Sequence, residues 1–481
     1  MFFSAYTLGC KLNQLETEAI IDSFSREGFC YVPWGRFSSG TGGESPVPPG
    51  PAIFIINTCT VTSMAEQKAR RVIRKALGAN PSACLIITGC YAQLDRDALA
   101  ALERELFPAS CAAENPGRLF VVSGDAKDRL LDLPVFLSAA GIPADFSARL
   151  CLPHVIKSWL ENLDPGTDGS FRYRPVNFSS HSRGFLKIQD GCDNHCAYCR
   201  VSIARGKSRS LRADDVLKEL RSLEERGFGE AVLTGVNISQ YRDIDMGLPG
   251  LLAFLLDGTE KIRIRLSSME PDFLASTRES VEFIRVLSDK RIRPHFHLSV
   301  QSGSAKILSR MGRAYTPLDI EGAADLFRSV REDPFIACDI IAGFPGETDN
   351  DYDETMEFCR KIDFAWIHVF PFSGRPGTPA FDFPEKVNEK TISLRVKSLT
   401  ELARKGRGNY FSRWVGKEVE AIIEAPKAGN TGFFTALSEN YLRFIAACGD
   451  KLVPIAGTRI RCRILGNGVG ERICLETHKC I

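Results

Sequence analysis

Three cysteines lie within one short stretch of the sequence, GCDNHCAYC at positions 191–199. Cys192, Cys196 and Cys199 have the spacing C-x3-C-x2-C. Clustered thiolates bind zinc or iron–sulfur clusters, but a structural site of either kind usually takes four protein ligands. A 4Fe–4S cubane has four irons, so three thiolates leave one iron without a protein ligand. A catalytic metal centre needs such an open coordination position. We therefore interpret the run as a catalytic 4Fe–4S site, with a zinc site or a chance cluster as the alternative.

A second set of three cysteines is dispersed through the N-terminal part of the chain. Cys10 lies in LGCKLN, Cys59 in NTCTVT and Cys90 in TGCYAQ, each at the end of a predicted strand. The carboxyl ends of parallel strands meet at one edge of an open α/β sheet, where ligands bind. We predict that these cysteines converge on a second cluster site that also has one open iron. Three unrelated buried cysteines are the alternative.

The remaining cysteines carry no ligand-like pattern. The chain has 16 cysteines and no sign of a secreted disulfide scaffold, so most of them are expected to be small buried hydrophobic residues. We interpret eight as core or incidental: Cys30, Cys84, Cys111, Cys151, Cys338, Cys359, Cys448 and Cys462. We assign no function to Cys474 and Cys480, which lie near the C-terminus.

Strand and helix patterns divide the chain into four parts. Residues 1–140 alternate buried strands with amphipathic helices, which predicts an open α/β domain with a Gly- and Pro-rich loop at 36–51. Residues 141–182 are irregular and predict a linker. Strand–helix units over 183–412 predict a partial (βα)6 barrel, in which the loops after the strands carry the chemistry. Short strands with turns over 413–481 predict a small β-barrel.

Composition sets broad limits on the class of protein. The 481 residues are 44% hydrophobic and 25% charged, as is usual for soluble globular domains. The formal net charge of +2 gives no bulk argument for a nucleic-acid partner. The first residues lack a signal-peptide pattern, and no apolar stretch is long enough for a membrane span. We expect a cytoplasmic protein with no membrane partner.

The cysteine loop resembles that of the radical S-adenosylmethionine enzymes, because Tyr198 precedes the last cysteine and strand–helix alternation follows. The resemblance implies that Cys192, Cys196 and Cys199 hold a 4Fe–4S cluster whose open iron is chelated by S-adenosylmethionine. One electron then breaks a C–S bond and gives a 5′-deoxyadenosyl radical. Strand ends in LTGVN, IRLSSMEP and HLSVQSGS place small or polar residues near this cofactor. The expected cofactor-side residues are Tyr198, Gly235, Asn237, Ser268, Glu270 and Gln301.

Taken together, the two cysteine sets resemble the methylthiotransferases. The stretches GCKLNQLETE, NTCTVT, TGCYAQ, FLKIQDGCDNHCAYC, ARGKSRS and VFPFSGRPGTPA carry a resemblance that spans nearly the whole chain, including a TRAM-like C-terminal barrel. It implies an auxiliary 4Fe–4S cluster on Cys10, Cys59 and Cys90, an electron donor and a sulfur source. NTCTVT and TGCYAQ are most similar to the MtaB-type branch, which methylthiolates C2 of N6-threonylcarbamoyladenosine beside the anticodon of tRNA. Ser202 and Ser299 stand where the family commonly has proline.

A tRNA partner requires local basic and aromatic residues. The stretch ARGKSRS places Arg205, Lys207 and Arg209 after the cluster loop, and ENYLRF contains Tyr441. We expect these four residues to contact the anticodon stem-loop, with a solvated or packed surface as the alternative. The basic run over 395–417 also holds aromatic residues, and its alternative is a helix that leads into a packed barrel.

Two other functions fit the same motifs. The first is the same chemistry on a different modified tRNA adenosine or on a ribosomal-protein aspartate. The second is a non-catalytic RNA-binding or iron–sulfur scaffold protein, which would not consume S-adenosylmethionine under reducing conditions.

Overall fold

The computed structural model describes residues 1–35, 50–106, 117–142, 151–163, 169–178, 181–271, 277–426, 433–447, 455–466 and 475–480. The predicted loop at 36–51 lies almost wholly outside these ranges, as do Cys111, Cys448 and Cys474. The chain forms two compact units. The first comprises 1–180, 190–193 and 199–207, and the second comprises 181–189, 194–198 and 208–481. The four-part division of the chain stays a prediction.

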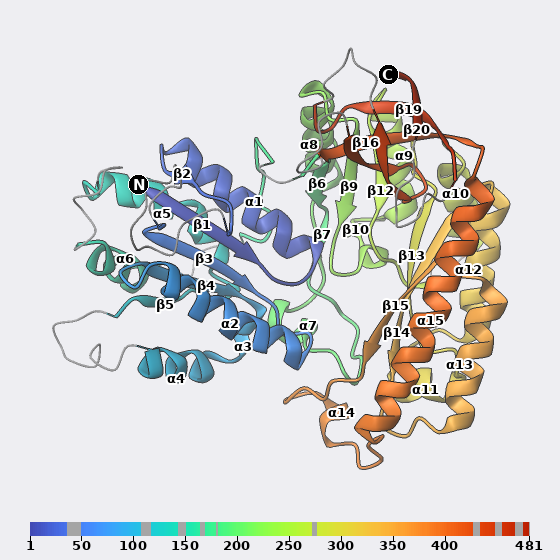
Figure 1. Cartoon of the computed structure of the whole chain (residues 1–481), viewed down its shortest axis with the longest axis horizontal. Helices are drawn as coiled ribbons and strands as arrows, with labels where there is room; N and C mark the ends of the chain where they lie inside the picture. The colour runs from blue at the N-terminus through green and yellow to red at the C-terminus, as the bar shows by residue number, and fades with distance from the viewer. Residues whose placement is uncertain are drawn as a thin grey trace. The chain divides into compact units, whose positions relative to one another are not determined.

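The first unit is built on a parallel sheet with the strand order β2-β1-β3-β4-β5 (Figure 1). Its strands are β1 (Phe2–Thr7), β2 (Cys30–Tyr31), β3 (Ile53–Thr58), β4 (Cys84–Gly89) and β5 (Leu119–Val121). Its helices are α1 (Lys11–Arg26), α2 (Ser63–Ala79), α3 (Cys90–Leu94), α4 (Arg96–Leu106), the 3-10 helix η2 (Lys127–Leu131), α5 (Leu133–Ala139) and α6 (Leu152–Glu161). The order of elements and the parallel pairing confirm the predicted open α/β fold.

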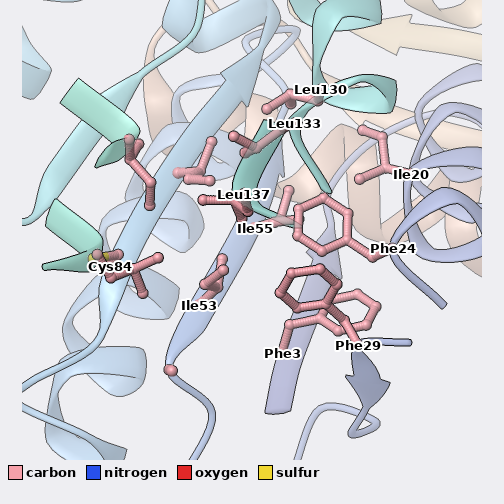
Figure 2. Close-up of a cluster of buried hydrophobic side chains, with 14 of the residues drawn as sticks. Phe3, Ile20, Phe24, Phe29, Ile53, Ile55, Cys84, Leu130, Leu133 and Leu137 are labelled. Atoms are coloured by element: carbon pink, nitrogen blue, oxygen red, sulfur yellow. The ribbon is translucent and has the colours of Figure 1, made fainter. Parts of the chain in front are cut away.

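The central strands of this sheet are covered on both faces. All six residues of β3 are buried, and successive side chains point to opposite faces of the sheet. Ile53 and Ile55 pack with Phe24 in the cluster drawn in Figure 2. Phe54 and Ile56 belong to a second cluster on the other face. This two-sided burial explains why β3 and β4 are nearly continuous apolar runs in the sequence.

The segment predicted to be an irregular linker contains a helix, so that part of the expectation is wrong. Helix α6 contributes Leu152, Ile156 and Trp159 to the core of the first unit. These residues are spaced four and three apart, which places them on one face of a helix. The apolar stripe is only ten residues long, and the Gly, Pro and Ser residues on either side hid it in the sequence.

The second unit begins with six parallel strands. They are β6 (Gly184–Lys187), β9 (Glu230–Thr234), β12 (Arg263–Leu266), β13 (His295–Gln301), β14 (Phe335–Ala342) and β15 (Trp366–Pro371). The strands form two parallel ladders, β12-β9-β6 and β13-β14-β15. Parallel bridges at Ile264–Ile292 and Met269–Leu298 join the ladders. The strands therefore follow the order β6-β9-β12-β13-β14-β15, which is also their order along the chain. This order confirms the predicted partial barrel.

Helices and short strands connect these six strands. The long helices are α8 (Ala213–Glu225), α9 (Leu248–Gly258), α10 (Thr277–Leu287), α12 (Pro317–Val330), α13 (Asp349–Ile362) and α15 (Glu389–Trp414). The short elements are β7 (Gln189–Asp190), α7 (Val201–Arg205), β8 (Arg209–Ser210), η4 (Ile238–Gln240), β10 (Arg242–Asp243), β11 (Met246–Gly247), α11 (Ala305–Arg310) and α14 (Pro379–Asp382). Helix α7 and Asp190 group with the first unit. None of the described helices is long and apolar enough to cross a bilayer.

An antiparallel sheet ends the chain, with the order β18-β17-β16-β19-β20. The strands are β16 (Glu418–Pro426), β17 (Phe433–Ser438), β18 (Arg443–Ala447), β19 (Arg459–Ile464) and β20 (Leu475–Cys480). The edge strands β18 and β20 lie against each other, which is consistent with the predicted small barrel. Tyr410, Phe411 and Trp414 of α15 are buried in its core. The aromatic residues of the 395–417 run therefore pack the barrel.

The cysteines outside the two predicted sites divide into two groups. Cys84, Cys338, Cys359 and Cys462 are buried, as predicted for core residues. Cys30 and Cys151 are exposed, because Cys30 begins the short edge strand β2 and Cys151 precedes the first turn of α6.

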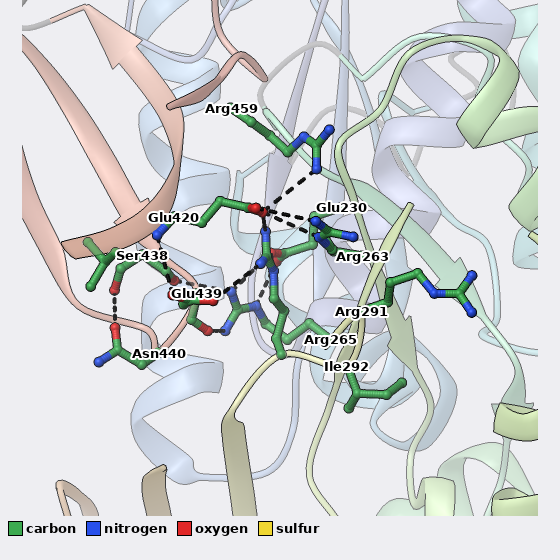
Figure 3. A network of polar contacts seen from close by, with 12 residues as sticks. Glu230, Arg263, Arg265, Arg291, Ile292, Glu420, Ser438, Glu439, Asn440 and Arg459 are labelled. Atoms are coloured by element: carbon green, nitrogen blue, oxygen red, sulfur yellow. Dashed lines mark hydrogen bonds and ion pairs between the residues drawn. The ribbon is translucent and has the colours of Figure 1, made fainter. Parts of the chain in front are cut away.

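A buried ion network holds the C-terminal sheet against the partial barrel (Figure 3). Arg265 donates two hydrogen bonds to Glu230, at 2.6 and 3.0 Å. Arg293 donates to Glu230 at 2.8 Å and to Glu420 of β16 at 2.6 Å. Burial raises the pKa of Glu230, but the charges of Arg265 and Arg293 outweigh burial and hold that pKa well below its usual range. The carboxylate is therefore ionised and fully paired.

The network makes a prediction about stability. Glu230→Gln leaves three buried guanidinium groups, those of Arg183, Arg265 and Arg293, with one counterion fewer, so we expect the free energy of unfolding to fall by about 3–5 kcal/mol. The matched control is Glu418→Gln, whose partner Arg463 and own side chain are both about half exposed; that change should cost less than about 1 kcal/mol. Urea unfolding of the full chain measures both values. Equal effects of the two substitutions would contradict the structural role of the network.

Candidate functional site

Cys10, Cys59 and Cys90 follow neighbouring strands of the first sheet. Cys10 caps the N-terminus of α1 just beyond β1, and Cys59 directly follows β3. Cys90 is the first residue of α3 and directly follows β4. Strand β3 pairs in parallel with both β1 and β4, so the three cysteines lie at the same edge of the sheet. The structure thus places the three predicted residues at one edge of the sheet, and their binding of a cluster stays a prediction.

Two glycines allow the cysteine loops to approach one another. Gly9 has a φ of +96°, and a Cβ added there would lie 2.8 Å from Cβ and 2.9 Å from Sγ of Cys59. Gly89 has a φ of +95°, and its added Cβ would collide with the carbonyl oxygen of Thr58 and lie 2.6 Å from Oδ1 of Asn57. Only glycine combines this backbone conformation with such close contacts. These contacts explain why glycine precedes the cysteine in LGCKLN and in TGCYAQ.

Asn13 and Asn57 fasten two of these loops to each other. The Asn13 amide donates to the carbonyl oxygens of Leu8, at 2.8 Å, and Thr58, at 3.1 Å. The Asn57 amide donates to the carbonyl oxygen of Asn13 at 3.0 Å. Both side chains are fully buried. Our sequence analysis overlooked these two residues, although they lie inside the quoted GCKLN and NTC stretches.

The Cys59 thiol has a strongly perturbed pKa. Burial raises the pKa of Cys59 to about 12, and the neighbouring Cys90 and Cys10 act in the same direction. A backbone hydrogen bond with Val61 and the charge of Arg205 oppose them. The Cys59 thiol is therefore protonated near neutral pH, and coordination to a metal would displace its proton.

The three thiols are ligands of the kind that bind iron–sulfur clusters. Among the described residues, no three His, Cys, Asp or Glu side chains are close enough to share one metal ion. A 4Fe–4S cubane spreads its ligands, since each thiolate binds a different iron. The strand ends that carry Cys10, Cys59 and Cys90 supply three such thiols at one edge of the sheet.

The loop with the C-x3-C-x2-C spacing repeats the Gly-Cys arrangement. Gly191 has a φ of +71°, and a Cβ there would collide with the carbonyl oxygen of Lys207. The backbone N–H of Cys192 donates to the carbonyl oxygen of Gly206 at 3.0 Å. The N–H of Val201 donates to the Cys199 sulfur at 3.3 Å, a contact that favours a thiolate. Cys196 belongs to the second unit and is buried.

Glu270 is the centre of a polar group in the second unit. Asn237 donates to it at 2.9 Å, Asn194 donates at 2.6 Å, and Arg313 forms an ion pair with it. Gly235 lies next to Gln189, since an added Cβ would lie 2.8 Å from Oε1 of that side chain. The N–H of Asn237 donates to the same Oε1 at 2.9 Å. Predicted residues Gly235, Asn237 and Glu270 are thus connected by short contacts.

Arg313 connects this group to Tyr198. Its guanidinium donates to the Tyr198 hydroxyl at 2.5 Å and lies over the rings of Tyr198 and Tyr315. The side chain is buried, and its Nε has no hydrogen-bond partner among the described residues. A buried cation with an unused donor suits an anionic ligand such as a carboxylate. Our sequence analysis overlooked Arg313, because its place beside Glu270 and Tyr198 follows from tertiary contacts 43 and 115 residues apart.

Ser268 and Gln301 do not bond to Glu270 in the contacts that the structure gives. The hydroxyl of Ser268 lies 2.8 Å from Nδ1 of His297, and Nε2 of His297 lies 3.4 Å from Asp339. Gln301 is buried at the end of β13 with a φ of +69°, next to an irregularity in the strand pairing. Their contact with a cofactor stays a prediction.

The four residues predicted to contact RNA have different surroundings. Lys207 and Arg209 are exposed. The Arg205 side chain is 9% exposed and forms ion pairs with Glu16 and Asp190. The Tyr441 ring stacks on His295 at a centroid distance of 3.9 Å. The last two side chains are engaged in packing inside their units, which does not favour RNA contact.

Comparisons with known proteins agree with these motifs. Residues 186–359 match the radical SAM superfamily, and residues 42–107 match uncharacterized protein family UPF0004. The threonylcarbamoyladenosine tRNA methylthiotransferase MtaB of Treponema pallidum is 37% identical, covering 96% of this chain and 98% of its own. The enzyme of the same name from Thermotoga maritima is 33% identical, covering 87% and 85%.

More distant proteins are also similar. The tRNA-2-methylthio-N(6)-dimethylallyladenosine synthase of Pelotomaculum thermopropionicum is 29% identical over 94% of both chains. Among solved structures, the radical S-adenosylmethionine methyltransferase TsrM of Kitasatospora setae has a TM-score of 0.47 and 14% identity, covering 79% of this chain and 73% of its own. That structural similarity is too low to say more about this chain.

The glycine contacts at the first site make a prediction. Gly89→Ala places a Cβ against Thr58 in a backbone conformation that is nearly restricted to glycine, so the free energy of unfolding should fall by at least about 2 kcal/mol. The control is Gly78→Ala in α2, where a Cβ meets open space and alanine favours the helix by roughly 1 kcal/mol. Urea unfolding compares the two variants. A Gly89→Ala chain as stable as the Gly78→Ala chain would rule out the close approach.

Proposed function

Because this chain belongs to the MtaB-type radical S-adenosylmethionine tRNA methylthiotransferases, we propose that it adds a methylthio group to C2 of N6-threonylcarbamoyladenosine beside the anticodon. The observation that carries the proposal is the pairing of a C-x3-C-x2-C loop with three further cysteines on adjacent strand ends. A radical enzyme that only cleaves S-adenosylmethionine has no use for the second set. A sulfur-inserting enzyme has such a use.

Cys192, Cys196 and Cys199 hold the first 4Fe–4S cluster in this proposal. When bound, the cluster and S-adenosylmethionine supply a 5′-deoxyadenosyl radical that removes the hydrogen from C2 of the adenine. The N–H of Val201 stabilises the Cys199 thiolate. Gly191 and the Cys192–Gly206 hydrogen bond fix the entry to the loop.

The polar group around Glu270 binds S-adenosylmethionine. Arg313 has a buried positive charge and an unused Nε donor for the methionine carboxylate. Glu270 holds Arg313 in place, and Asn237 and Asn194 orient Glu270 in turn. The lack of a side chain at Gly235 lets Gln189 lie against the backbone just after β9, and Tyr198 packs against Arg313. Ser268 and Gln301 complete the expected set.

Cys10, Cys59 and Cys90 hold the auxiliary 4Fe–4S cluster. When bound, that cluster supplies the sulfur that carries the methyl group. The buried amides of Asn13 and Asn57 keep the loops of Cys10 and Cys59 in register. The reaction also requires an external electron donor and a sulfur source, and its tRNA substrate places the enzyme in the cytoplasm.

Lys207 and Arg209 are the proposed RNA contacts on the cluster loop. Both are exposed directly after the cysteine run, where a phosphate backbone near the radical site would pass. Arg205 and Tyr441 are not proposed as RNA contacts, because their side chains are packed within their units.

The alternative is the same chemistry on another substrate. The dimethylallyladenosine synthase of Pelotomaculum thermopropionicum is 29% identical to this chain, so a different modified tRNA adenosine is the nearest choice. A ribosomal-protein aspartate is the more distant one. Both alternatives keep the two clusters and change only the acceptor.

The separate roles of the two cysteine sets can be tested with single substitutions. Cys196→Ala should abolish 5′-deoxyadenosine, because the radical needs the first cluster. Cys59→Ala should still form 5′-deoxyadenosine but give no methylthio nucleoside. The measurement is chromatography with mass spectrometry after anaerobic reconstitution, and Cys338→Ala, a buried cysteine of the second unit, is the control. Unchanged iron content and product in Cys59→Ala would refute the auxiliary cluster.

The RNA contact can be tested by charge reversal. Lys207→Glu with Arg209→Glu should weaken tRNA binding and make its dependence on salt less steep, with the logarithmic slope falling by roughly one for each phosphate that is no longer neutralised. The matched control reverses Lys218 and Arg221, two exposed basic residues of α8. Filter binding over a range of salt concentrations measures both slopes. Equal losses of affinity in the two double variants would exclude a specific contact at the cluster loop.

A further inference from the structure

Two buried arginines lie at the ends of the short helix α7: Arg200 precedes its first residue, and Arg205 is its last residue. We refer to Arg200 and Arg205 as the arginine clamp. A five-residue helix has little stability of its own, so its position depends on what its side chains bind. Both arginine side chains are less than a tenth exposed, which is unusual for this residue type unless it is paired.

Arg200 binds the elements that carry Cys59 and Cys90. It donates to the Thr60 hydroxyl at 3.1 Å, and Thr60 follows Cys59. It donates two hydrogen bonds to the carboxylate of Asp95, at 3.0 and 3.3 Å, and Asp95 caps the helix that begins at Cys90. Arg200 directly follows Cys199 in the chain. Its forked guanidinium therefore connects the backbone at Cys199 to the loops of Cys59 and Cys90.

Arg205 makes the corresponding contacts on the other side of α7. It donates to Glu16 at 3.0 and 3.2 Å and to Oδ1 of Asn13 at 2.8 Å, both on the helix that Cys10 caps. It also donates to Asp190 at 3.0 Å, and the same Asp190 oxygen accepts the N–H of Gly191 at 2.8 Å. Arg205 thus joins the loop of Cys10 to the segment that leads into Cys192.

The charges are arranged so that the clamp is both stable and specific in geometry. Glu16 lies between Arg205 and Lys127, and its side chain is 1% exposed. Removing one member of such a buried network leaves an unpaired charge, which is strongly unfavourable. Two-point arginine–carboxylate contacts also fix direction, which a single lysine charge does not.

We propose that Arg200 and Arg205 are positioning residues that hold Cys192 and Cys199 at a fixed separation from Cys10, Cys59 and Cys90. This inference rests on the proposed function, since it assumes that both sets of cysteines carry clusters. Transfer of a methylthio group requires the substrate radical to meet the sulfur in one geometry, and small displacements of reacting groups are costly in rate. The clamp supplies that geometry through groups that are not cluster ligands.

The Nε of Arg200 adds a second observation. The side chain is 8% exposed, and this nitrogen has no hydrogen-bond partner among the described residues. A buried donor left unused is energetically unfavourable. This unused donor belongs to the side chain that also contacts Thr60, the residue after Cys59.

The test replaces each clamp arginine with lysine, which keeps the charge and removes the fork. Arg200→Lys and Arg205→Lys are compared with Arg221→Lys, an exposed arginine of α8, and with the unmutated chain, all after anaerobic reconstitution. We expect full iron content and 5′-deoxyadenosine within twofold of the unmutated chain. The methylthio product should fall on the order of a hundredfold. Pulsed EPR of the reduced protein should show a changed magnetic interaction between the two clusters.

Each outcome distinguishes the clamp from the proposed function. If the unmutated chain holds only one cluster, the proposed function itself fails. If it holds two, and both lysine variants keep the product yield and the magnetic interaction, only the clamp is overturned. If a lysine variant loses iron, Asp95→Asn, which keeps the shape of the Arg200 partner, is measured in the same way. Loss of iron in that variant too would assign these residues to folding and would also overturn the clamp.

Discussion

The close approach of Gly9 and Gly89 to the end of β3 is the constraint on which the first site depends. Strands of a parallel sheet are held at a fixed spacing, so loops at their carboxyl ends come together only where side-chain bulk is absent. Gly9 touches Cys59, and Gly89 touches Thr58. The positions of Cys10, Cys59 and Cys90 follow from these contacts and from the strand register.

Buried charge has a different role in each unit. In the second unit, Glu230 gathers Arg265 and Arg293 and joins the C-terminal sheet to the partial barrel. In the first unit, Glu16 and Asp95 receive the two arginines at the ends of α7. Ionised groups are poor sources of net stability compared with apolar packing, but they fix direction and separation. Both networks lie where elements distant in sequence must keep one geometry.

The sequence was informative where the residues of a pattern lie close together along the chain. It was misleading where a side chain contacts a residue that is distant in the sequence. Apolar strands, the cysteines at their ends and the C-x3-C-x2-C spacing are local, and they led to the predicted fold and to both cysteine sets. Arg205 looked like an RNA contact from its basic neighbours, yet its partner Glu16 lies 189 residues away. The ring of Tyr441 stacks on the ring of His295, which belongs to β13. Arg313 was overlooked because only tertiary packing places it beside Tyr198.

The proposed function assigns one cysteine set to the radical, the other to the sulfur, and the buried polar group around Glu270 to S-adenosylmethionine. The most direct test is the nucleoside composition of tRNA treated with the reconstituted chain. We expect methylthio modification of tRNA that carries N6-threonylcarbamoyladenosine and none of tRNA that carries dimethylallyladenosine. Modification of the dimethylallyl substrate alone, or of neither, would contradict the assigned function.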